Sequence, residues 1–349
     1  MNNIKKLIDK LEYYHTLTLE EYRYLAENFS PDVLNYIAPK ALNAKKSVYG
    51  DDIYIRGLIE ISNICKNNCT YCGIRRENKN CVRYRLTKEQ ILSCCSEGYK
   101  LGFRTFVMQG GEDGFFSDDV MCSVISEIKE NYPDCAVTLS LGERSYESYK
   151  RLFDAGADRY LLRHETARYE HYSMLHPKDM SFDKRMECLN NLKEIGYQVG
   201  CGFMVGSPYQ TPLDIATDLK FIEEFSPHMC GIGPFIAHKD TPFAKEPNGS
   251  SLFTCYLLAI IRLIKPTILL PATTALATVA EDGRKMGISC GANVVMPNLS
   301  PINQRAKYTL YDNKAYLDTE AAEGLELLKK SLEDIGARVV TARGDIKEI

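Results

Sequence analysis

Short runs rich in β-branched and aromatic residues alternate with helical segments along most of this chain of 349 residues. Consecutive parallel strands need a crossover of a dozen or more residues, usually a helix, so the alternation predicts βαβ units. Eight steps of roughly thirty residues predict a complete (β/α)8 TIM barrel. The expected strands are Tyr54–Ser62, Thr105–Gln109, Ala136–Ser140, Arg159–Arg163, Gln198–Val205, Met229–Phe235, Thr267–Pro271 and Ala292–Met296.

Helical patterns lie between most of these strands, and several carry end signals. Thr87 is followed three residues later by Gln90, a capping-box spacing. Gly102, Gly156 and Gly196 stand where the C-terminal caps of helices belong. The expected helices are Thr87–Leu101, Ser117–Asn131, Ser145–Ala155, Ser181–Ile195, Thr211–Phe225 and Ser250–Ile264.

The two ends of the chain lie outside this repeat. Residues 1–50 lack strand signals and predict an N-terminal helical extension, with a helix start at Thr18–Glu21, that packs across the bottom of the barrel. Residues 51–313 would form the barrel itself. Residues 314–349 would close it, with a helix over Thr319–Ile335, then Gly336 and a short strand. The last βα unit has the weakest pattern, because Met296–Pro301 opens a long loop.

Composition narrows the functional class. The formal net charge of −3, from 43 basic and 46 acidic residues, shows no excess of positive charge of the kind that nucleic-acid-binding proteins carry. No apolar run approaches the length that spans a bilayer, and the N-terminus lacks the apolar stretch of a signal peptide. We therefore expect a cytoplasmic protein that binds neither nucleic acid nor membrane.

Three cysteines, Cys65, Cys69 and Cys72, follow directly after the first expected strand. Three thiolates on a four-iron cluster leave one iron without a protein ligand, whereas structural zinc sites and closed clusters usually take four. An iron with an open position can bind the amino and carboxylate groups of S-adenosylmethionine. The triplet thus resembles the signature of the radical S-adenosylmethionine enzymes.

Other roles for the cysteines remain open. A structural zinc site could recruit Cys81, nine residues beyond Cys72, or a distant histidine. A disulfide framework is less favoured, because 13 cysteines is an odd number and a chain of this length does not need disulfide bonds to stabilise its core. Most of the other cysteines, such as Cys188, lie singly in apolar or helical surroundings and are expected to be buried.

Polar and small residues stand at the ends of the expected strands, where a barrel collects its catalytic groups. Gln109–Asp113 contains paired glycines that let the backbone approach a ligand, although such turns are common. Arg163 and Glu165 could grip a carboxylate and a pair of ribose hydroxyls, although a surface ion pair is the plainer explanation. Further candidates, each with a structural alternative, are Thr138, Ser140, Arg185, Gly231–Phe235, Pro271–Thr274, Tyr308 and Tyr311.

Taken together, these motifs resemble one family closely, the radical S-adenosylmethionine maturases of [FeFe]-hydrogenase of the HydE type. The resemblance covers nearly the whole chain after residue 50, and Arg163–Thr166 is its most specific part. It rests on Ile59–Asn63, Arg75–Arg76, Asn78–Asn80, Gln109–Asp113, Thr138–Glu143, Asp158–Ala167, Gly231–Phe235, Pro271–Ala275 and Cys290–Asn298.

The resemblance implies one [4Fe-4S] cluster on Cys65, Cys69 and Cys72, and cleavage of S-adenosylmethionine to a 5′-deoxyadenosyl radical. By motif position it implies cofactor contacts from Tyr71, Gln109, Gly111, Glu165, Arg185 and Ile232. It implies substrate contacts from Thr138, Arg163, Thr273, Thr274, Tyr308 and Tyr311. Some members of the family carry a second cluster on C-terminal cysteines, but Cys290 is the last cysteine here, so we predict none of that type.

The resemblance also implies a substrate and partners. The substrate would be a small organometallic or cysteine-derived compound, such as a cysteine-bound iron carbonyl cyanide unit. The partners would be a radical S-adenosylmethionine tyrosine lyase, a scaffold GTPase, and a flavodoxin or ferredoxin as electron donor. A basic run from Arg75 to Arg85 could dock an acidic donor, or its side chains could order the cluster loop. Biotin synthase and methylornithine synthase are the nearest rival activities, and a zinc-binding barrel protein is the non-enzymatic alternative.

Overall fold

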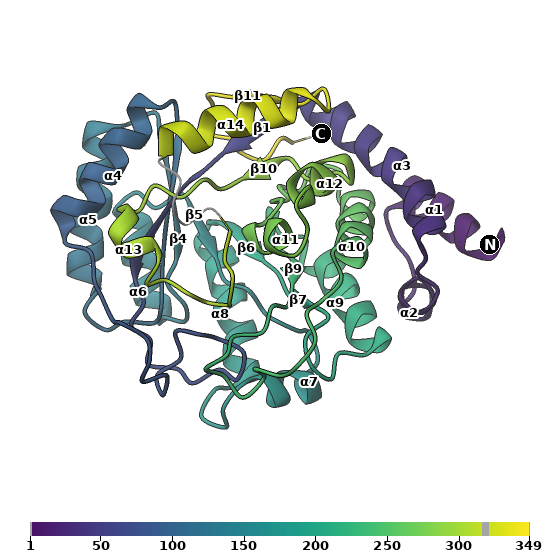
Figure 1. The fold of residues 1–349 in the computed structure, drawn as a ribbon, viewed down its shortest axis with the longest axis horizontal. Helices are drawn as coiled ribbons and strands as arrows, with labels where there is room; N and C mark the ends of the chain where they lie inside the picture. The colour runs from purple at the N-terminus through teal and green to yellow at the C-terminus, as the bar shows by residue number, and fades with distance from the viewer. Residues whose placement is uncertain (1, 316–320, 349) are drawn as a thin grey trace.

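A parallel sheet of six strands forms the centre of the molecule (Figure 1). The computed structural model describes residues 2–315 and 321–348. The strands, in spatial order, are β2 (Gly57–Ser62), β3 (Thr105–Gly110), β4 (Ala136–Ser140), β5 (Arg159–Leu161), β6 (Gln198–Cys201) and β8 (Met229–Cys230). The prediction of an α/β fold built from parallel βαβ units is confirmed.

The seventh and eighth expected strands are much reduced. Leu269 forms an isolated parallel bridge to Met229, and Pro271 forms another to β10 (Val294–Val295). A third bridge joins Leu58 of β2 to Asn298. Proline has no N–H to donate to a ladder, and Pro271 lies within this stretch, so pairing by single bridges has a local cause.

Three of the expected strands are each divided into two. The first breaks at Arg56, and its first half, β1 (Asp52–Ile55), pairs with β10 and β11 (Arg338–Val340) in a separate sheet. The fifth and sixth break to give β7 (Met204–Val205) and β9 (Gly233–Pro234), which pair with each other. The strands pass too closely for a side chain at Gly202, where a Cβ atom would lie 2.1 Å from the carbonyl oxygen of Gly231.

All six expected helices form, with ends close to the predicted ones. Thr87 and Gln90 make the predicted capping box at the start of α4, and Gly196 ends α8 in the left-handed conformation. These helices are α4 (Lys88–Lys100), α5 (Asp118–Asn131), α6 (Tyr146–Asp154), α8 (Phe182–Ile195), α9 (Pro212–Phe225) and α10 (Ser251–Ile264). Four short helices were not predicted: α7 (Tyr169–Leu175), α11 (Thr274–Val279), α12 (Gly283–Ser289) and α13 (Ile302–Arg305).

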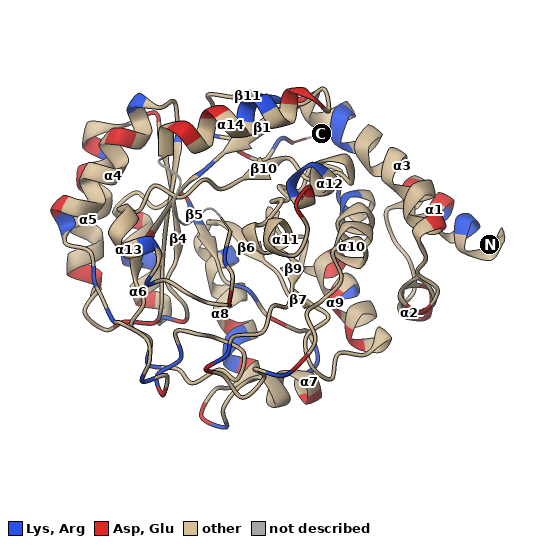
Figure 2. Ribbon diagram, in the orientation of Figure 1, with Lys and Arg blue, Asp and Glu red and all other residues tan. Residues whose placement is uncertain are grey.

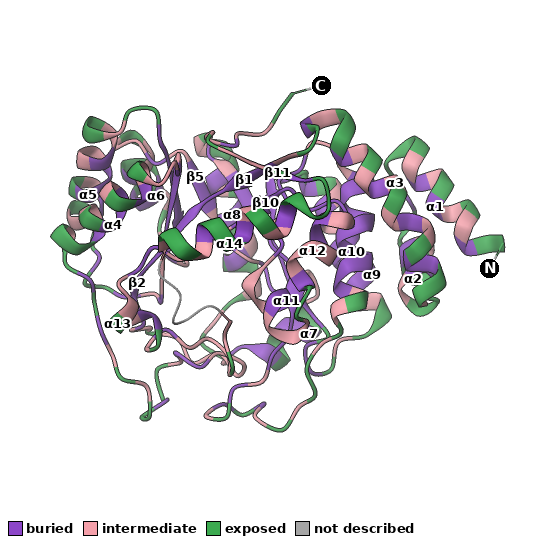
Figure 3. Cartoon of the chain, turned by 45° about the horizontal axis from the view of Figure 1, so that its top comes forward, coloured by how far each residue is buried: buried purple, intermediate pink, exposed green. Residues whose placement is uncertain are grey.

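The N-terminal extension forms three helices, α1 (Asn2–Tyr14), α2 (Leu19–Glu27) and α3 (Pro31–Tyr49). The expected placement across the bottom of the barrel is wrong, because these helices lie outside α9 and α10 (Figure 1). The reason is α10, in which every residue from Thr254 to Ile264 is buried (Figure 3) and which carries little charge (Figure 2). A helix that is apolar all round must be covered on both sides, and α3 supplies the outer cover.

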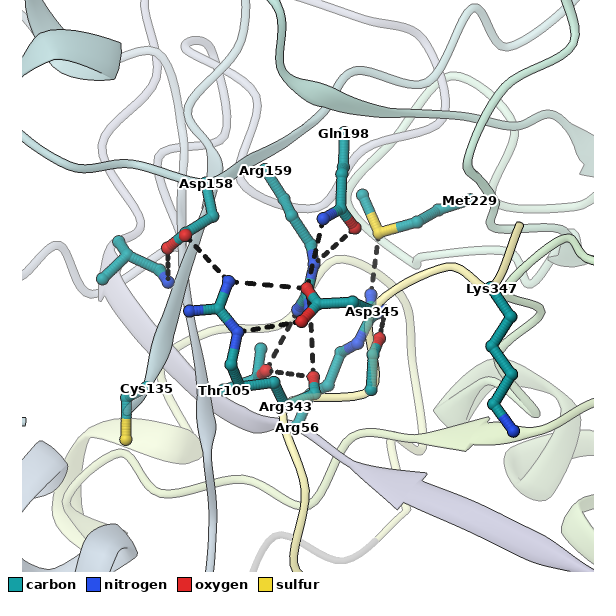
Figure 4. A network of polar contacts seen from close by, with 12 residues as sticks. Arg56, Thr105, Cys135, Asp158, Arg159, Gln198, Met229, Arg343, Asp345 and Lys347 are labelled. Atoms are coloured by element: carbon teal, nitrogen blue, oxygen red, sulfur yellow. Dashed lines mark hydrogen bonds and ion pairs between the residues drawn. The ribbon is translucent and has the colours of Figure 1, made fainter. Parts of the chain in front are cut away.

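The C-terminal segment covers the end of the sheet opposite the cysteine loop. After α14 (Ala321–Glu333) and β11, the tail inserts Asp345 beside Arg159, the first residue of β5 (Figure 4). Arg159 also donates to Thr105 Oγ1, at the start of β3, and to Gln198 Oε1, at the start of β6. Residues 319–320, the first two of the predicted helix, lie outside the described residues. Within the described ranges, no helix combines the length and the apolar composition needed to cross a membrane.

Candidate active site

A cavity of about 340 Å³ opens between the carboxyl ends of the strands and the cysteine loop. This is the end at which parallel barrels place their chemistry. Thirteen of the fifteen predicted site residues line it: Cys65, Cys69, Tyr71, Cys72, Gln109, Gly111, Thr138, Arg163, Glu165, Arg185, Thr273, Tyr308 and Tyr311. Residues separated by more than two hundred positions in the sequence therefore meet in one space.

Two predicted site residues do not line the cavity. Ile232 is buried in the hydrophobic core, although its neighbours Gly231 and Gly233 do reach the cavity. Thr274 is the first residue of α11, and its carbonyl accepts a bond from Thr278 Oγ1 at 2.9 Å. The alternation of residues along an extended segment turns Ile232 away from the side that its glycine neighbours present.

The cysteine loop has almost no regular structure, and Arg83 supplies four of the hydrogen bonds that order it. The guanidinium of Arg83 donates to the carbonyl oxygens of Ile74, Arg75 and Asn78 at 2.7, 2.6 and 3.2 Å. A fourth bond reaches the carbonyl of Asn63, on the other side of the triplet. These contacts support the view that the basic run orders the loop.

The three thiols face the cavity from a poorly solvated site. Burial raises the pKa of Cys65 and Cys72, and it raises the pKa of Cys69 to about 12. The thiolates that bind iron are therefore favoured only when a cationic centre compensates them. Among the described residues, no three histidine, cysteine or carboxylate side chains converge on one metal-ion position. A [4Fe-4S] cluster does not require such convergence on one position, because each thiolate binds a different iron atom.

The Gly-Gly-Glu turn after β3 packs tightly against the cysteine loop. A Cβ atom at Gly111 would lie 2.2 Å from the carbonyl oxygen of Ile64 and 2.8 Å from Cys65 Cβ. The next residue, Glu112, pairs with Lys66 at 3.0 Å and accepts the N–H of Glu143 at 3.1 Å. The turn thus fixes the cysteine loop against the end of β4.

Arg163 and Glu165 leave the end of β5 side by side. Their atoms Nη2 and Oε2 are 3.1 Å apart, but neither atom makes a well-formed hydrogen bond among the described residues. Thr138 Oγ1 is also buried and makes no hydrogen bond among the described residues. Glu165 also has a φ of 65°, a strained backbone conformation of the kind that clusters at functional sites. Buried polar atoms without partners fit a cavity that takes a polar ligand.

Arg185 and the two tyrosines complete the wall. Arg185 Nε donates to Glu143 Oε1 at 2.6 Å and Nη1 donates to the carbonyl of Arg163 at 2.7 Å, so the guanidinium already has a carboxylate partner. Gln109 Nε2 donates to the hydroxyl of Tyr308 at 3.2 Å. Burial raises the pKa of Tyr311, which keeps its hydroxyl protonated.

Sequence reasoning missed four methionines and an arginine that line the cavity. Met180 Sδ lies 3.7 Å from Cys69 Sγ, and Met204, Met229 and Met296 also line the space. Arg56 lies at its far end, where Nη1 is 2.8 Å from Met229 Sδ. The charge of Arg56, within the mainly apolar start of the first expected strand, was a signal that could have revealed this part of the site.

Comparisons with known proteins agree with this geometry. Residues 59–222 match the profile of the Radical SAM superfamily. The [FeFe] hydrogenase maturase subunit HydE of Thermotoga maritima is 44% identical over 294 residues, which cover 84% of each chain. This chain belongs to the HydE family of radical S-adenosylmethionine enzymes.

Members of the Radical SAM superfamily use a [4Fe-4S] cluster and S-adenosylmethionine, and the cavity fits both by its three thiols and its unpartnered polar atoms. The 3-methylornithine synthase of Methanosarcina barkeri is more distant, at 26% identity over 89% of this chain and 88% of the relative. The crystal structure of methylornithine synthase (PylB) has a TM-score of 0.84 at 25% identity and covers 96% of this chain and 97% of its own. The same fold thus serves more than one reaction.

Proposed function

We propose that this chain cleaves S-adenosylmethionine reductively and acts in the assembly of the diiron subcluster of [FeFe]-hydrogenase. The observation that carries the proposal is the convergence of Cys65, Cys69 and Cys72 with Arg163 and Glu165 on one cavity, in a member of the HydE family. When bound, the cluster and S-adenosylmethionine supply a 5′-deoxyadenosyl radical. The protein supplies binding, orientation and exclusion of water.

The cavity wall divides into two regions in this proposal. Glu165, Gln109, Gly111, Tyr71 and Arg185 would contact S-adenosylmethionine by their motif positions, and all five line the cavity together with the three cysteines. Thr138, Arg163, Thr273, Tyr308 and Tyr311 would contact the substrate. The unpartnered Nε of Arg163 and the hydroxyl of Thr138 suit a carboxylate such as that of cysteine. Thr274 and the side chain of Ile232 could take part only if the site rearranged.

The substrate class rests on the resemblance to the HydE family, and the polar set is compatible with a cysteine carboxylate. We infer a cysteine-ligated iron carbonyl cyanide unit or a related cysteine-derived thiol, supplied by a second maturase, with the product passing to a scaffold GTPase. We also infer that the chain binds one [4Fe-4S] cluster. We infer further that the β-bridges of Leu269, Pro271 and Asn298 complete a barrel. In this proposal the chain divides into an N-terminal extension (1–50), the barrel (51–313) and a C-terminal segment (314–349). A flavodoxin or ferredoxin would supply the electron.

The distribution of cysteines bears on the rival functions. Cys188, Cys201 and Cys230 are buried and do not line the cavity, so they offer no support for a biotin synthase-like sulfur-donating cluster. Cys81, the fourth ligand in the zinc hypothesis, also lies outside the lining and contacts Asn63 Nδ2 at 3.4 Å.

Replacement of Cys69 by Ala tests the proposal, with Cys81→Ala as the matched control. After anaerobic reconstitution, Cys69→Ala should lose the cluster absorbance and 5′-deoxyadenosine formation, whereas Cys81→Ala should keep both. Retained cleavage in Cys69→Ala would contradict the assignment. A second assay, activation of hydrogenase by the complete set of maturases, distinguishes this function from methylornithine or biotin synthesis.

A further inference from the structure

Residues 307–315, which we call the strap, cross the cavity beside the cysteine loop. Tyr308, Leu310 and Tyr311 of the strap line the cavity. At one side, Gly73 N–H donates to the carbonyl of Leu310 at 2.8 Å, and Asn63 Nδ2 donates to that of Lys307 at 2.7 Å. At the other side, Ala315 N–H donates to Thr278 Oγ1 at 3.1 Å and Asp312 N–H to the carbonyl of Ala237 at 3.2 Å. The strap therefore spans from the cysteine loop to α11.

One lysine of the strap turns inward. The side chains of Lys314 and Glu60 are 7% and 1% exposed and form an ion pair inside the sheet. Lys314 Nζ also donates to the carbonyl of Tyr308 at 3.1 Å and lies 5.1 Å from the centre of its ring. The second carboxylate oxygen of Glu60 accepts from Asn298 Nδ2 at 2.9 Å. Both charges are thus paired and hydrogen-bonded.

Tyr308 is held at both of its ends by neighbouring strands. Glu60 of β2 lies opposite Gln109 of β3 in the ladder. Gln109 donates to the Tyr308 hydroxyl at 3.2 Å, while Glu60 holds its carbonyl through Lys314. Neither Glu60 nor Lys314 lines the cavity, so the pair acts on the cavity through Tyr308.

A pair of this kind does more for geometry than for stability. Removing two charges from water offsets most of their attraction, and apolar replacements of a buried pair are often neutral or stabilising. The directed bonds of the pair nevertheless select one position of the strap. We propose that Glu60 and Lys314 form a latch that positions Tyr308 and keeps the strap closed over bound substrate. The identity of that substrate rests on the proposed function; the position of the strap does not.

Hydrogen exchange of the full-length chain, with and without reconstituted cluster, tests the latch. In Lys314→Met the amides of residues 307–315 should exchange at least tenfold faster, while those of β4 stay unchanged. Lys307→Met is the control, since Lys307 Nζ donates to the neighbouring Gln304 Oε1 at 3.1 Å instead of reaching into the sheet. Lys314→Arg keeps the charge and should restore most of the protection.

Turnover supplies a readout that a purely structural role would not move. In Lys314→Met, 5′-deoxyadenosine formation without substrate should stay within twofold, whereas the substrate-dependent rate should fall about tenfold. If Lys314→Met does not fold, the double variant Glu60→Met/Lys314→Met replaces the pair by apolar side chains, and its strap should still exchange faster. Unchanged exchange in the strap, or equally faster exchange in β4, would overturn the latch. If exchange becomes faster only in the strap but the unmodified chain fails to activate hydrogenase, the latch is supported and the proposed function is contradicted.

Discussion

His164 Nε2 lies 3.3 Å from Asp218 Oδ1, and both side chains are completely buried. Gly202 N–H donates to His164 Nδ1 at 3.3 Å, so the ring proton is on Nε2 and faces the carboxyl group. Burial lowers the pKa of His164 to about 3, which keeps the ring neutral. Asp218 Oδ1 also accepts the N–H of Ala167 at 2.5 Å. The pair therefore fixes the main chain on both sides of the strained Glu165.

Removal of this acceptor should weaken both the fold and the cavity wall. Asp218→Ala removes the acceptor of the Ala167 N–H and the carboxyl group that lies 3.3 Å from His164 Nε2, and we expect it to lower the free energy of unfolding by about 2–4 kcal/mol. Asp218→Asn keeps an oxygen and should lose less. Urea titration measures both variants, and Asp183→Ala, an exposed acid on α8, is the control. Equal losses for Ala and Asn would contradict the role of the oxygen.

Gly111 should be intolerant of any side chain. Because a Cβ atom there would lie 2.2 Å from the Ile64 carbonyl oxygen, Gly111→Ala must displace the cysteine loop. We expect a severalfold lower iron content after reconstitution, measured by metal analysis and absorbance. Gly114 stands in the same turn with nothing within 4 Å of an added Cβ, so Gly114→Ala should bind iron normally. Normal iron content in Gly111→Ala would show that the loop can yield.

Local signals explain what the sequence could predict. The capping box of Thr87 and Gln90 and the left-handed Gly196 depend on neighbouring residues only, and both formed as expected. The cysteine triplet and Arg163 could be placed together because parallel strands bring their carboxyl ends to one edge.

Contacts between residues that are far apart in the chain explain the features that the sequence could not predict. Lys314 meets Glu60 across 254 positions and Arg159 meets Asp345 across 186, and no nearby residue indicates either partner. The outer placement of α3 depends on the all-round apolar surface of α10, which the helix period alone did not reveal. Similarly, the break of the first strand at Arg56 reflects a tertiary contact with Met229.

Asp345 should make stability depend on acid pH. Burial raises the pKa of this carboxyl group, but the hydrogen bond from Arg343 and the charge of Arg159 outweigh it and lower the pKa from 3.8 to about 2. A depressed pKa contributes stability above pH 3.8 that is lost as the pH falls toward about 2.

Asp345→Asn should therefore destabilise the protein by about 1–2 kcal/mol at pH 7, below the usual value for a buried pair because this side chain is 38% exposed. The difference from the unmodified chain should shrink as the pH is lowered from 4 to 3 in urea titrations at about 25 °C. Asp51→Asn, which removes an exposed partner of Lys46, should change little at either pH. A difference that stays constant with pH would show that the carboxylate charge is not what matters.

The basic run beside the cysteine loop serves two purposes in our final prediction. Arg83 binds backbone carbonyls of the loop, and the side chain of Arg85, although 40% exposed, binds Asp113 through Nε and Nη2 at 2.7 and 2.9 Å. Arg76 and Lys79 are also exposed, and Arg76 Nη1 in addition donates to the carbonyl of Lys66 at 3.2 Å. An acidic electron donor would be attracted by these outer charges, and the attraction would weaken over a Debye length of about 10 Å at 0.1 M salt.

The double variant Arg76→Gln/Lys79→Gln should therefore reduce donor-dependent cleavage of S-adenosylmethionine about threefold to tenfold at low salt and little at high salt. Cleavage driven by dithionite should not change, because a small reductant needs no docking surface. Lys5→Gln/Lys6→Gln on α1 removes the same charge far from the cysteine loop and serves as the control. If donor-dependent rates show no salt dependence, the basic run does not dock the donor and only orders the cysteine loop. In that case Arg83→Met should lower the iron content after reconstitution, whereas Arg76→Gln/Lys79→Gln should leave the iron content unchanged.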